Sequence, residues 1–173
     1  MGSVKLLIND KAWPYTSLTI TSPTSSNIGG FSATVKCPGR NFTDLLGPIE
    51  VWKDGEIIFA GWVQEINPSL RGIDVELSGD SLDYILTSVY TTTEHKYYHK
   101  RVDEMVKDLM NYYLPNIDTS KVEQHEHEYL EMTIANNTQL YDVLRGLASL
   151  ENSYFYLKPT SNNPILIFKK KEE

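Results

Sequence analysis

The residue types that could bind a metal ion are concentrated in residues 123–128, which read Glu-Gln-His-Glu-His-Glu. In a β-strand, residues i and i+2 point to the same side, so His125 and His127 could place both imidazoles on one ion. His95 and His99 are four residues apart and could converge in the same way if their segment were helical. The chain has no H-E-x-x-H motif and no cysteine pair, and a polar strand edge or loop explains alternating His and Glu without a metal. We therefore predict no metal site and no cofactor.

Two carboxylate pairs could imitate a general acid and base, Asp80 with Asp83 and Asp103 with Glu104. A helix N-cap is the simpler role for Asp80, and the second pair falls in the first turn of a predicted helix, where the helix dipole favours anions. The single cysteine, Cys37, precedes Pro-Gly and is expected to be a small residue at a strand end. Nucleophile-elbow, phosphate-loop and dinucleotide motifs are all missing from the sequence. The prediction is a protein that is not an enzyme.

Composition and charge narrow the class of protein further. The chain has 173 residues, 40% of them hydrophobic, and a formal net charge of −7. An acidic protein of this kind is not expected to bind nucleic-acid phosphates in general, since that function needs a basic face. No apolar run reaches the roughly 18 residues of a membrane span, so no stable membrane insertion is expected. The lysines at 169–171 are predicted to be a solvated tail, or the cut edge of a longer protein.

The first half of the chain is predicted to be all β, centred on a meander at residues 49–89. Asp54-Gly55 lies between two alternating runs and predicts a type I′ hairpin turn. Gly61 interrupts a long strand expected at 57–66, which suggests a bulge or a bend at a barrel corner. A short apolar run predicts a strand at 4–8, and alternating runs predict strands at 15–21, 31–37 and 72–78. Asp80 is the candidate cap of one or two predicted helical turns that end at Leu86. About six short strands with close turn signals favour a barrel or a sandwich, and we predict a small antiparallel β-barrel for residues 1–90.

The second half, residues 91–173, is predicted to be an α+β domain. Residues 91–100 show no period and are interpreted as a linker or extended arm. Helical spacing of apolar residues predicts helices at 101–113 and at about 138–150, the latter capped by Asn137 or Thr138. Strands are expected at 129–134, 154–157 and 165–168, the last two forming a hairpin.

Aromatic residues indicate where the protein could contact a partner. Because Val51 is expected to point inward, Trp52 falls on the other face of its strand, and Trp62 is placed on an outer face as well. Large aromatic side chains on an outer face suggest a partner surface. Tyr97 and Tyr98 are further candidates, since tyrosine is enriched at interfaces.

Several short motifs, taken in order, resemble one known family. Residues 51–55 (VWKDG) and 59–63 (FAGWV) resemble the hallmark hairpin of tail-hub proteins of phages and related contractile injection systems, the late-control-D-like baseplate hubs. Residues 77–86 (LSGDSLDYIL) are similar to the "G-x-D-x-x-x-x-L" element that this family carries at its barrel exit. Residues 137–148 (NTQLYDVLRGLA) are similar to the family helix "S-x-W-D-x-L-x-x-L-A", with Tyr141 in place of the more common tryptophan. In this chain, as in that family, a strand hairpin that begins x-Y-F-Y follows the helix.

This resemblance implies a tail-tube-like barrel followed by an α+β domain, acting through subunit interfaces and not through catalysis. It implies a virion tail or prophage-derived particle, assembled in the host cytoplasm. It also implies self-association into a trimeric or hexamer-like ring and contact with other tail or baseplate proteins. Family members are usually longer and return to a second barrel, so the resemblance implies either a fragment or a minimal version. The alternatives are a carbohydrate- or peptide-binding module on a host-recognition apparatus and, third, a hydrolase that uses the α+β half.

Overall fold

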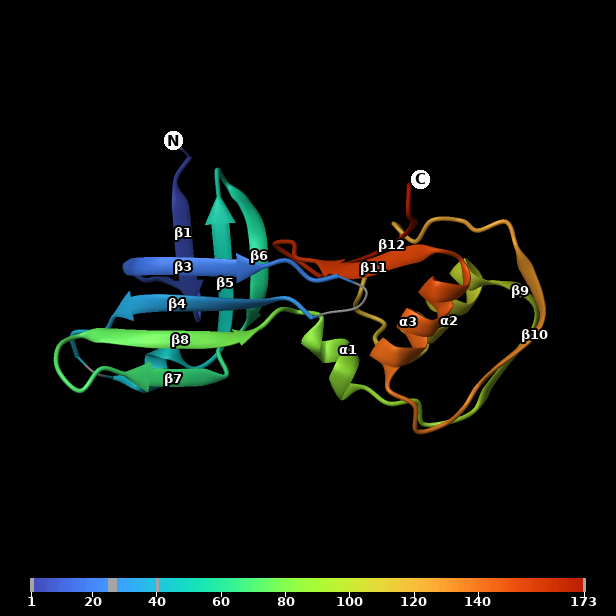
Figure 1. Ribbon diagram of the computed structural model, residues 1–173, viewed down its shortest axis with the longest axis horizontal. Coiled ribbons are helices and arrows are strands. Elements are labelled where there is room, and N and C mark those ends of the chain that lie inside the picture. The colour runs from blue at the N-terminus through green and yellow to red at the C-terminus, as the bar shows by residue number, and fades with distance from the viewer. Residues whose placement is uncertain (1, 25–27, 40, 173) are drawn as a thin grey trace. The chain divides into compact units, whose positions relative to one another are not determined.

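A computed structural model describes residues 2–24, 28–39 and 41–172 of the chain. The described residues form two compact units (Figure 1). The first unit comprises Met1–Pro23 and Ile28–Tyr84, and the second comprises Thr24–Asn27 and Ile85–Glu173. This division falls at the start of the short helix α1 (Tyr84–Ser88). The domain boundary near Tyr90 stays a prediction.

The first unit consists of two four-stranded antiparallel sheets, with strand orders β2-β1-β5-β6 and β3-β4-β8-β7. The strands of one sheet cross those of the other in Figure 1. The strands of the first sheet are β1 (Val4–Ile8), β2 (Lys11–Ala12), β5 (Pro48–Lys53) and β6 (Glu56–Trp62). Those of the second are β3 (Tyr15–Thr21), β4 (Gly30–Lys36), β7 (Glu65–Pro68) and β8 (Asp74–Asp80). A single 3-10 turn, Phe42–Leu45, precedes β5.

Alternation of buried and exposed residues builds the core of this unit. Inward residues of both sheets form one apolar cluster, in which the rings of Phe31 and Phe59 meet edge to face at 5.9 Å. The Asp54-Gly55 turn is confirmed, since both residues have positive φ, 52° and 85°. The prediction of a mainly β first half is therefore confirmed.

A closed barrel was expected, but the described residues of the first unit form two separate sheets. The long strand expected at 57–66 is broken after Trp62, and its two parts, β6 and β7, belong to different sheets. Between β6 and β8 there is one isolated bridge, Gly61 to Ser81, and not a continuous ladder. A barrel requires a ladder on both sides of every strand, and this corner does not provide one.

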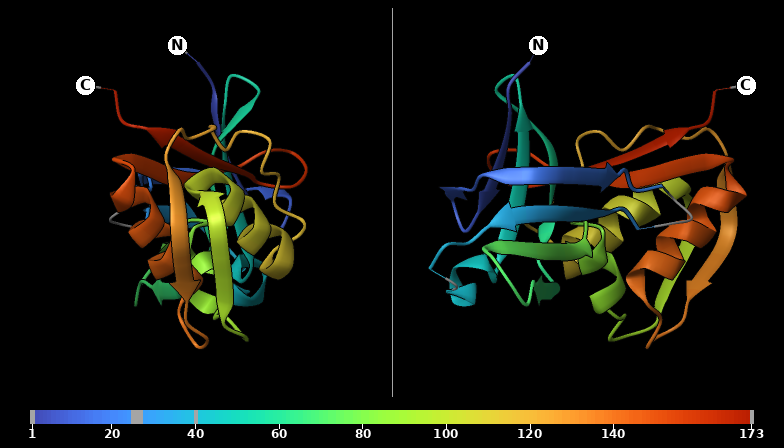
Figure 2. Two further views of the ribbon diagram at one scale, coloured as in Figure 1. Left: turned by 90° about the vertical axis from the view of Figure 1, so that its right-hand side faces the viewer. Right: turned by 60° about the vertical axis from the view of Figure 1, so that its left-hand side comes forward.

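The second unit has the predicted α+β character. Its helices are α2 (Val102–Tyr113) and α3 (Leu140–Leu150), and its strands form two antiparallel pairs, β9 with β10 and β11 with β12. The strand bounds are β9 (His95–Arg101), β10 (Glu128–Ile134), β11 (Ser153–Lys158) and β12 (Ile165–Lys170). Figure 2 shows β9 and β10 side by side, with both helices beside them. No helix in the described part of the chain is long and apolar enough to cross a membrane.

Four local predictions are wrong in this structure. The expected linker contains β9, a strand without an apolar alternation because most of its side chains are exposed. Asp80 ends strand β8 and does not cap a helix, because Gly30 and Asp80 pair across the sheet. Helix α3 is preceded by Gln139, whose side chain makes no cap hydrogen bond, in place of a cap by Asn137 or Thr138. Lys169 and Lys170 belong to β12 and not to a solvated tail, because cross-strand pairing with β11 extends the strand beyond its apolar residues; the alternative of a cut edge of a longer protein stays a prediction.

Candidate subunit-contact surface and the buried histidine network

The outer face of the sheet β2-β1-β5-β6 carries both tryptophans that the sequence placed on an outer face. Val51 and Phe59 are buried in the core, so the alternation turns Trp52 and Trp62 to the opposite face, where both are partly exposed. A hollow of about 440 Å³ lies beside the indole of Trp52, lined by Ser3, Lys5, Leu7, Ala12, Trp52 and Gly55. We name this hollow and the two tryptophans the tryptophan face.

The indole of Trp52 is held in place by a neighbouring carboxylate. Its Nε1–H donates a hydrogen bond of 2.8 Å to Oε2 of Glu50, two residues earlier on the same strand. The polar edge of the ring is thereby satisfied, while its apolar body remains available beside the hollow. An indole with this arrangement is typical of the aromatic anchors that dominate protein interfaces.

The two tyrosines proposed for an interface lie on opposite faces of β9. Tyr98 is 56% exposed, but Tyr97 is only 9% exposed and donates a hydrogen bond of 2.7 Å to Oδ2 of Asp108 on α2. Burial, and then this hydrogen bond, raises the pKa of Tyr97. The expectation that Tyr97 contacts a partner thus needs correction, because strand alternation turns its side chain toward α2 of the same unit. Tyr98 remains a candidate contact residue.

The structure separates the histidines that could have shared a metal ion. His125 is fully buried in a loop before β10, and both of its ring nitrogens are in hydrogen-bond contacts, Nδ1 with the carbonyl oxygen of Glu123 at 2.8 Å and Nε2 with Oγ of Ser153 at 2.9 Å. His127 is exposed and meets the ring of Tyr129 edge to face. The loop is not a strand, so the same-side rule for i and i+2 does not apply.

The other histidine pair, His95 and His99, lies on a strand and not on a helix. His95 Nε2 lies 2.6 Å from the hydroxyl of Tyr113, and His99 Nδ1 lies 3.1 Å from Oε1 of Glu128. Four residues along a strand separate the two by about 13 Å, so they cannot meet one ion. Among the described residues, no group of three or more His, Cys, Asp or Glu side chains could hold a metal.

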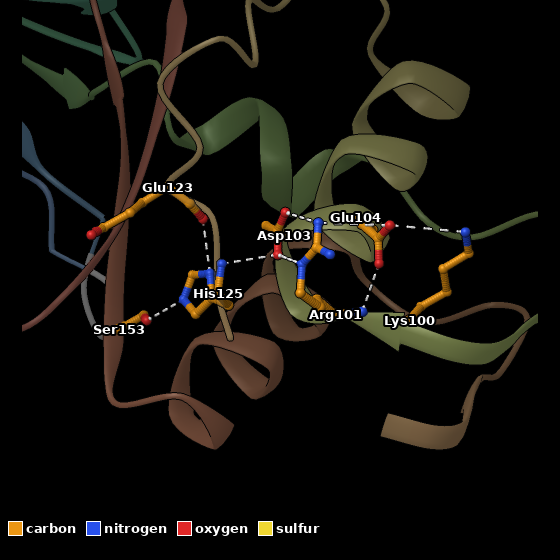
Figure 3. A network of polar contacts seen from close by, with 7 residues as sticks. All are labelled: Lys100, Arg101, Asp103, Glu104, Glu123, His125 and Ser153. Carbon is orange, nitrogen blue, oxygen red and sulfur yellow. Dashed lines mark hydrogen bonds and ion pairs between the residues drawn. The ribbon is translucent and has the colours of Figure 1, made fainter. Parts of the chain in front are cut away.

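A network of polar contacts joins the start of α2 to His125 (Figure 3). The carboxylate of Asp103 is almost fully buried and accepts from the His125 backbone N–H at 3.0 Å and from Nε and Nη2 of Arg101 at 3.1 and 3.3 Å. Glu104 accepts the backbone N–H of Arg101 at 2.9 Å. The network therefore fixes the His125 loop to the first turn of α2, which is a structural role.

Burial by itself would raise the pKa of Asp103, but hydrogen bonds from Arg101 and the His125 backbone outweigh it, and the pKa is lowered below its ordinary value of 3.8. A group with a lowered folded-state pKa stabilises the fold above its unfolded pKa, and this stabilisation is lost as the pH falls through the folded-state pKa. We expect the second unit to lose stability below about pH 4, with Asp103 contributing to this loss.

Asp103→Asn tests this expectation. The substitution removes the charge-assisted bonds and is expected to lower the free energy of unfolding by about 2 kcal/mol at pH 7. Between pH 7 and pH 3 the variant is expected to lose less stability than the unchanged protein, because it lacks the carboxylate that titrates. Near-ultraviolet circular dichroism in urea, from pH 7 to pH 3, measures both quantities. Asp142→Asn is the control, because its partner Arg145 is about half exposed and a change below about 0.5 kcal/mol is expected. Identical pH curves for Asp103→Asn and the unchanged protein would contradict the assignment.

The remaining chemical candidates do not converge on a reactive centre. Asp80 accepts a hydrogen bond from Gln64 on the outer face of its sheet, whereas Asp83 is buried and accepts from Ser81 at 3.0 Å. Cys37 is buried, as expected for a small strand-end residue. Each of these side chains is thus explained by its place in the fold.

Comparisons with known proteins place this fold among phage-tail-like proteins. No family model matches the chain, and no curated protein matches it by sequence. Among solved structures, similar chains include a tail protein from Neisseria meningitidis MC58 (18% identity, TM-score 0.67) and the 43 kDa tail protein of prophage MuSo2 from Shewanella oneidensis (16%, 0.66). A third is the E. coli c3393 protein, a component of the type VI secretion system described as structurally similar to the T4 bacteriophage tail proteins gp27 and gp5 (9%, 0.61).

These matches cover 95%, 96% and 96% of this chain, but only 50%, 54% and 48% of the respective neighbours. The chain thus spans about half the length of the solved proteins that it resembles. The similarity extends over both units and establishes a phage-tail-like fold.

Proposed function

We propose that this chain is a structural subunit of a phage tail or of a related tail-like injection machine, in which it acts as a baseplate hub or tube-initiating protein. The observation that supports this most is the fold similarity, which runs through nearly the whole chain in three tail or secretion proteins. The hub motifs at 51–63, 77–86 and 137–148 support the narrower assignment. The role requires subunit contacts and no catalytic residue.

The proposed subunit contacts involve the tryptophan face and Tyr98. Specific interfaces bury an apolar anchor inside a polar rim, and Trp52 beside its hollow provides such an anchor. We propose that copies of the chain assemble into a trimeric or hexamer-like ring that contacts other tail proteins in a virion tail or prophage-derived particle, assembled in the host cytoplasm. Residues 1–90 and 91–173 are proposed as its two domains.

Self-association tests the proposal directly. Light scattering over a concentration series, with negative-stain images of the same sample, is expected to show a ring-shaped trimer or hexamer. A strictly monomeric chain at high concentration, without rings in the images, would contradict assembly through contacts between copies.

Trp52→Ala combined with Trp62→Ala is expected to weaken self-association. Loss of an interface anchor typically costs at least 2 kcal/mol, so we expect the dissociation constant to rise about 30-fold or more. Sedimentation velocity provides the measurement. The control is Leu70→Ala, because Leu70 is 99% exposed and lies outside the tryptophan face. Equal dissociation constants for the double variant and the control would exclude this face from the contact.

One observation also favours a binding module for carbohydrates or peptides. The hollow beside Trp52 is lined mainly by apolar groups, and the partly exposed indole of Trp52 is suited to stack on a sugar. Titration with an oligosaccharide panel, followed by tryptophan fluorescence, separates the two functions. Saturable quenching that disappears in Trp52→Ala, in a chain that stays monomeric, would favour the module over the ring subunit.

A further inference from the structure

Two hollows of opposite charge lie on the surface, one on each unit, and neither belongs to the tryptophan face. The first, the lysine hollow, has a volume of about 470 Å³. The second, the acidic hollow, has a volume of about 420 Å³. Their positions in the two sheets determine which charged side chains they present.

The lysine hollow is built on β12 and on the segment that pairs with it. Lys169 lies opposite Tyr154 in the β11–β12 register, so both side chains lie on the same face. Val122 forms a parallel bridge with Phe168, which brings Lys121 next to this face. The four lysines at the hollow, Lys121, Lys169, Lys170 and Lys171, outnumber its two glutamates, Glu123 and Glu172.

These lysines are available for an external partner. Lys121, Lys169 and Lys171 are exposed, and in the described part of the chain none of the four lysines forms an ion pair within the unit. Glu123 is engaged by the backbone, since its Oε2 accepts the N–H of Lys170 at 3.0 Å. The ring of Tyr154 stacks on that of Tyr156, with centroids 6.3 Å apart, and forms one wall of the surface.

The acidic hollow lies on the outer face of the sheet β3-β4-β8-β7. Val75 and Leu77 of β8 point into the core, so Asp74, Glu76 and Asp80 point outward. Asp80 and Glu65 line the hollow, and Asp74 and Glu76 extend the acidic face beyond it. Glu65 on β7 lies opposite Ser78 on the same face. The rest of the lining is rich in hydroxyl and amide groups: Thr19, Thr21, Ser32, Gln64 and Ser78.

Few cations balance this acidic face. Lys36 lies opposite Asp74 in the register, at one end of the face. None of Glu65, Glu76 and Asp80 takes part in an ion pair among residues 2–24, 28–39 and 41–172. Carboxylates on one face whose charge no neighbouring cation neutralises give a local negative field that attracts a basic surface.

We propose that the lysine hollow of one copy binds the acidic hollow of the next copy, so that the chain assembles head to tail. The inference rests on the proposed ring function and deepens it, because it adds to the tryptophan face a second contact between copies and states its charge character. A symmetric pairing of either hollow with itself would bring like charges together. A head-to-tail contact uses two different surfaces on each copy, and it closes into a ring when the rotation between copies permits. A second copy is the occupant that we infer, because this same chain carries both complementary surfaces.

Charge reversal tests the contact. One variant carries Lys121→Glu and Lys169→Glu, the second carries Glu65→Lys and Glu76→Lys, and a third combines all four substitutions. All four side chains are exposed, so the variants are expected to fold, which circular dichroism checks. The matched controls are Lys107→Glu and Glu56→Lys, which reverse exposed charges outside both hollows.

Each two-site variant is expected to raise the dissociation constant for self-association by about tenfold or more, because like charges then face each other. The four-site variant is expected to regain association, since its reversed hollows are again complementary. Mixing the two two-site variants should give assemblies in which they alternate, and therefore only even-numbered closed rings. Sedimentation velocity at low and high NaCl should show weaker association of the unchanged protein at high salt.

The outcomes separate this inference from the proposed function. If the unchanged protein and the two-site variants assemble equally well, the head-to-tail contact is overturned, but the proposed ring is not. Failure of the four-site variant to regain association would overturn the pairing of these two hollows and indicate an acidic surface on another protein as the partner of the lysines. A monomeric unchanged protein would overturn both the ring and this contact.

Discussion

Gly79→Ala is expected to destabilise the first unit by about 3 kcal/mol, because β8 has no room for a side chain at this position. A Cβ added to Gly79 would collide with the carbonyl oxygen of Trp62 and lie 2.9 Å from Cε1 of Phe31. The corresponding glycine on β6, Gly61, faces the carbonyl oxygen of Asp80 in the same way. The backbones of β6 and β8 thus approach directly at the corner between the two sheets. Backbone atoms cannot move aside as a flexible side chain can, so the strands must separate.

Urea denaturation followed by tryptophan fluorescence measures this effect in the first unit, because Trp13, Trp52 and Trp62 all belong to it. Gly146→Ala in α3 is the control, since an added Cβ there has no neighbour within 4 Å. Its effect falls in the second unit, so its unfolding is followed by the near-ultraviolet circular dichroism of the tyrosines. Alanine in a helix is favoured over glycine by about 0.5–1 kcal/mol, so this variant is expected to be slightly more stable. A Gly79→Ala protein as stable as the unchanged protein would show that β6 and β8 are farther apart than described.

His125→Ala is expected to lower the free energy of unfolding of the second unit by about 3 kcal/mol. The ring is fully buried and meets that of Phe168 in a T-shaped contact, with ring centroids 5.6 Å apart, so its removal leaves a cavity. The carbonyl of Glu123 accepts only, so Nδ1 carries a proton and donates to it, and this bond and the Ser153 contact are both lost. Near-ultraviolet circular dichroism of the tyrosines, which are concentrated in this unit, follows its unfolding.

His127→Ala provides the comparison, because the same residue type is exposed two positions later. We expect its effect to stay within about 0.5 kcal/mol. The pair also tests the metal hypothesis, since a shared ion would make both substitutions equally damaging. A thermal midpoint that falls on addition of EDTA in the unchanged protein, but not in either variant, would show that the two histidines bind a metal.

Local patterns in the sequence were sufficient to predict most elements. A short apolar run predicted β1, period-two alternation predicted β3, β4, β5 and β8, and helical spacing predicted α2 and α3. Such patterns are informative because side-chain direction within an element is set by its own backbone geometry. The hairpin at Asp54-Gly55 followed from the φ values that its turn requires. The outward direction of Trp52 followed from the inward direction of its neighbour Val51.

Features that depend on distant segments were predicted poorly. Strand β9 has few apolar residues, so it is recognised as a strand only from its pairing with β10, about thirty residues later. Burial separated His125 from His127 and Tyr97 from Tyr98, although the members of each pair are neighbours in the sequence. The sequence also showed a row of lysines but not the face that Lys169 shares with Tyr154 and Lys121.

Sequence patterns alone thus predict the type of most elements and, within the predicted strands and helices, the face on which a side chain lies, since both depend on backbone geometry within a few residues. The two separate sheets of the first unit and the gathering of opposite charges in two hollows become evident in the folded chain alone. Strand pairing and burial bring together residues far apart in the chain, and no local period indicates which segments will meet.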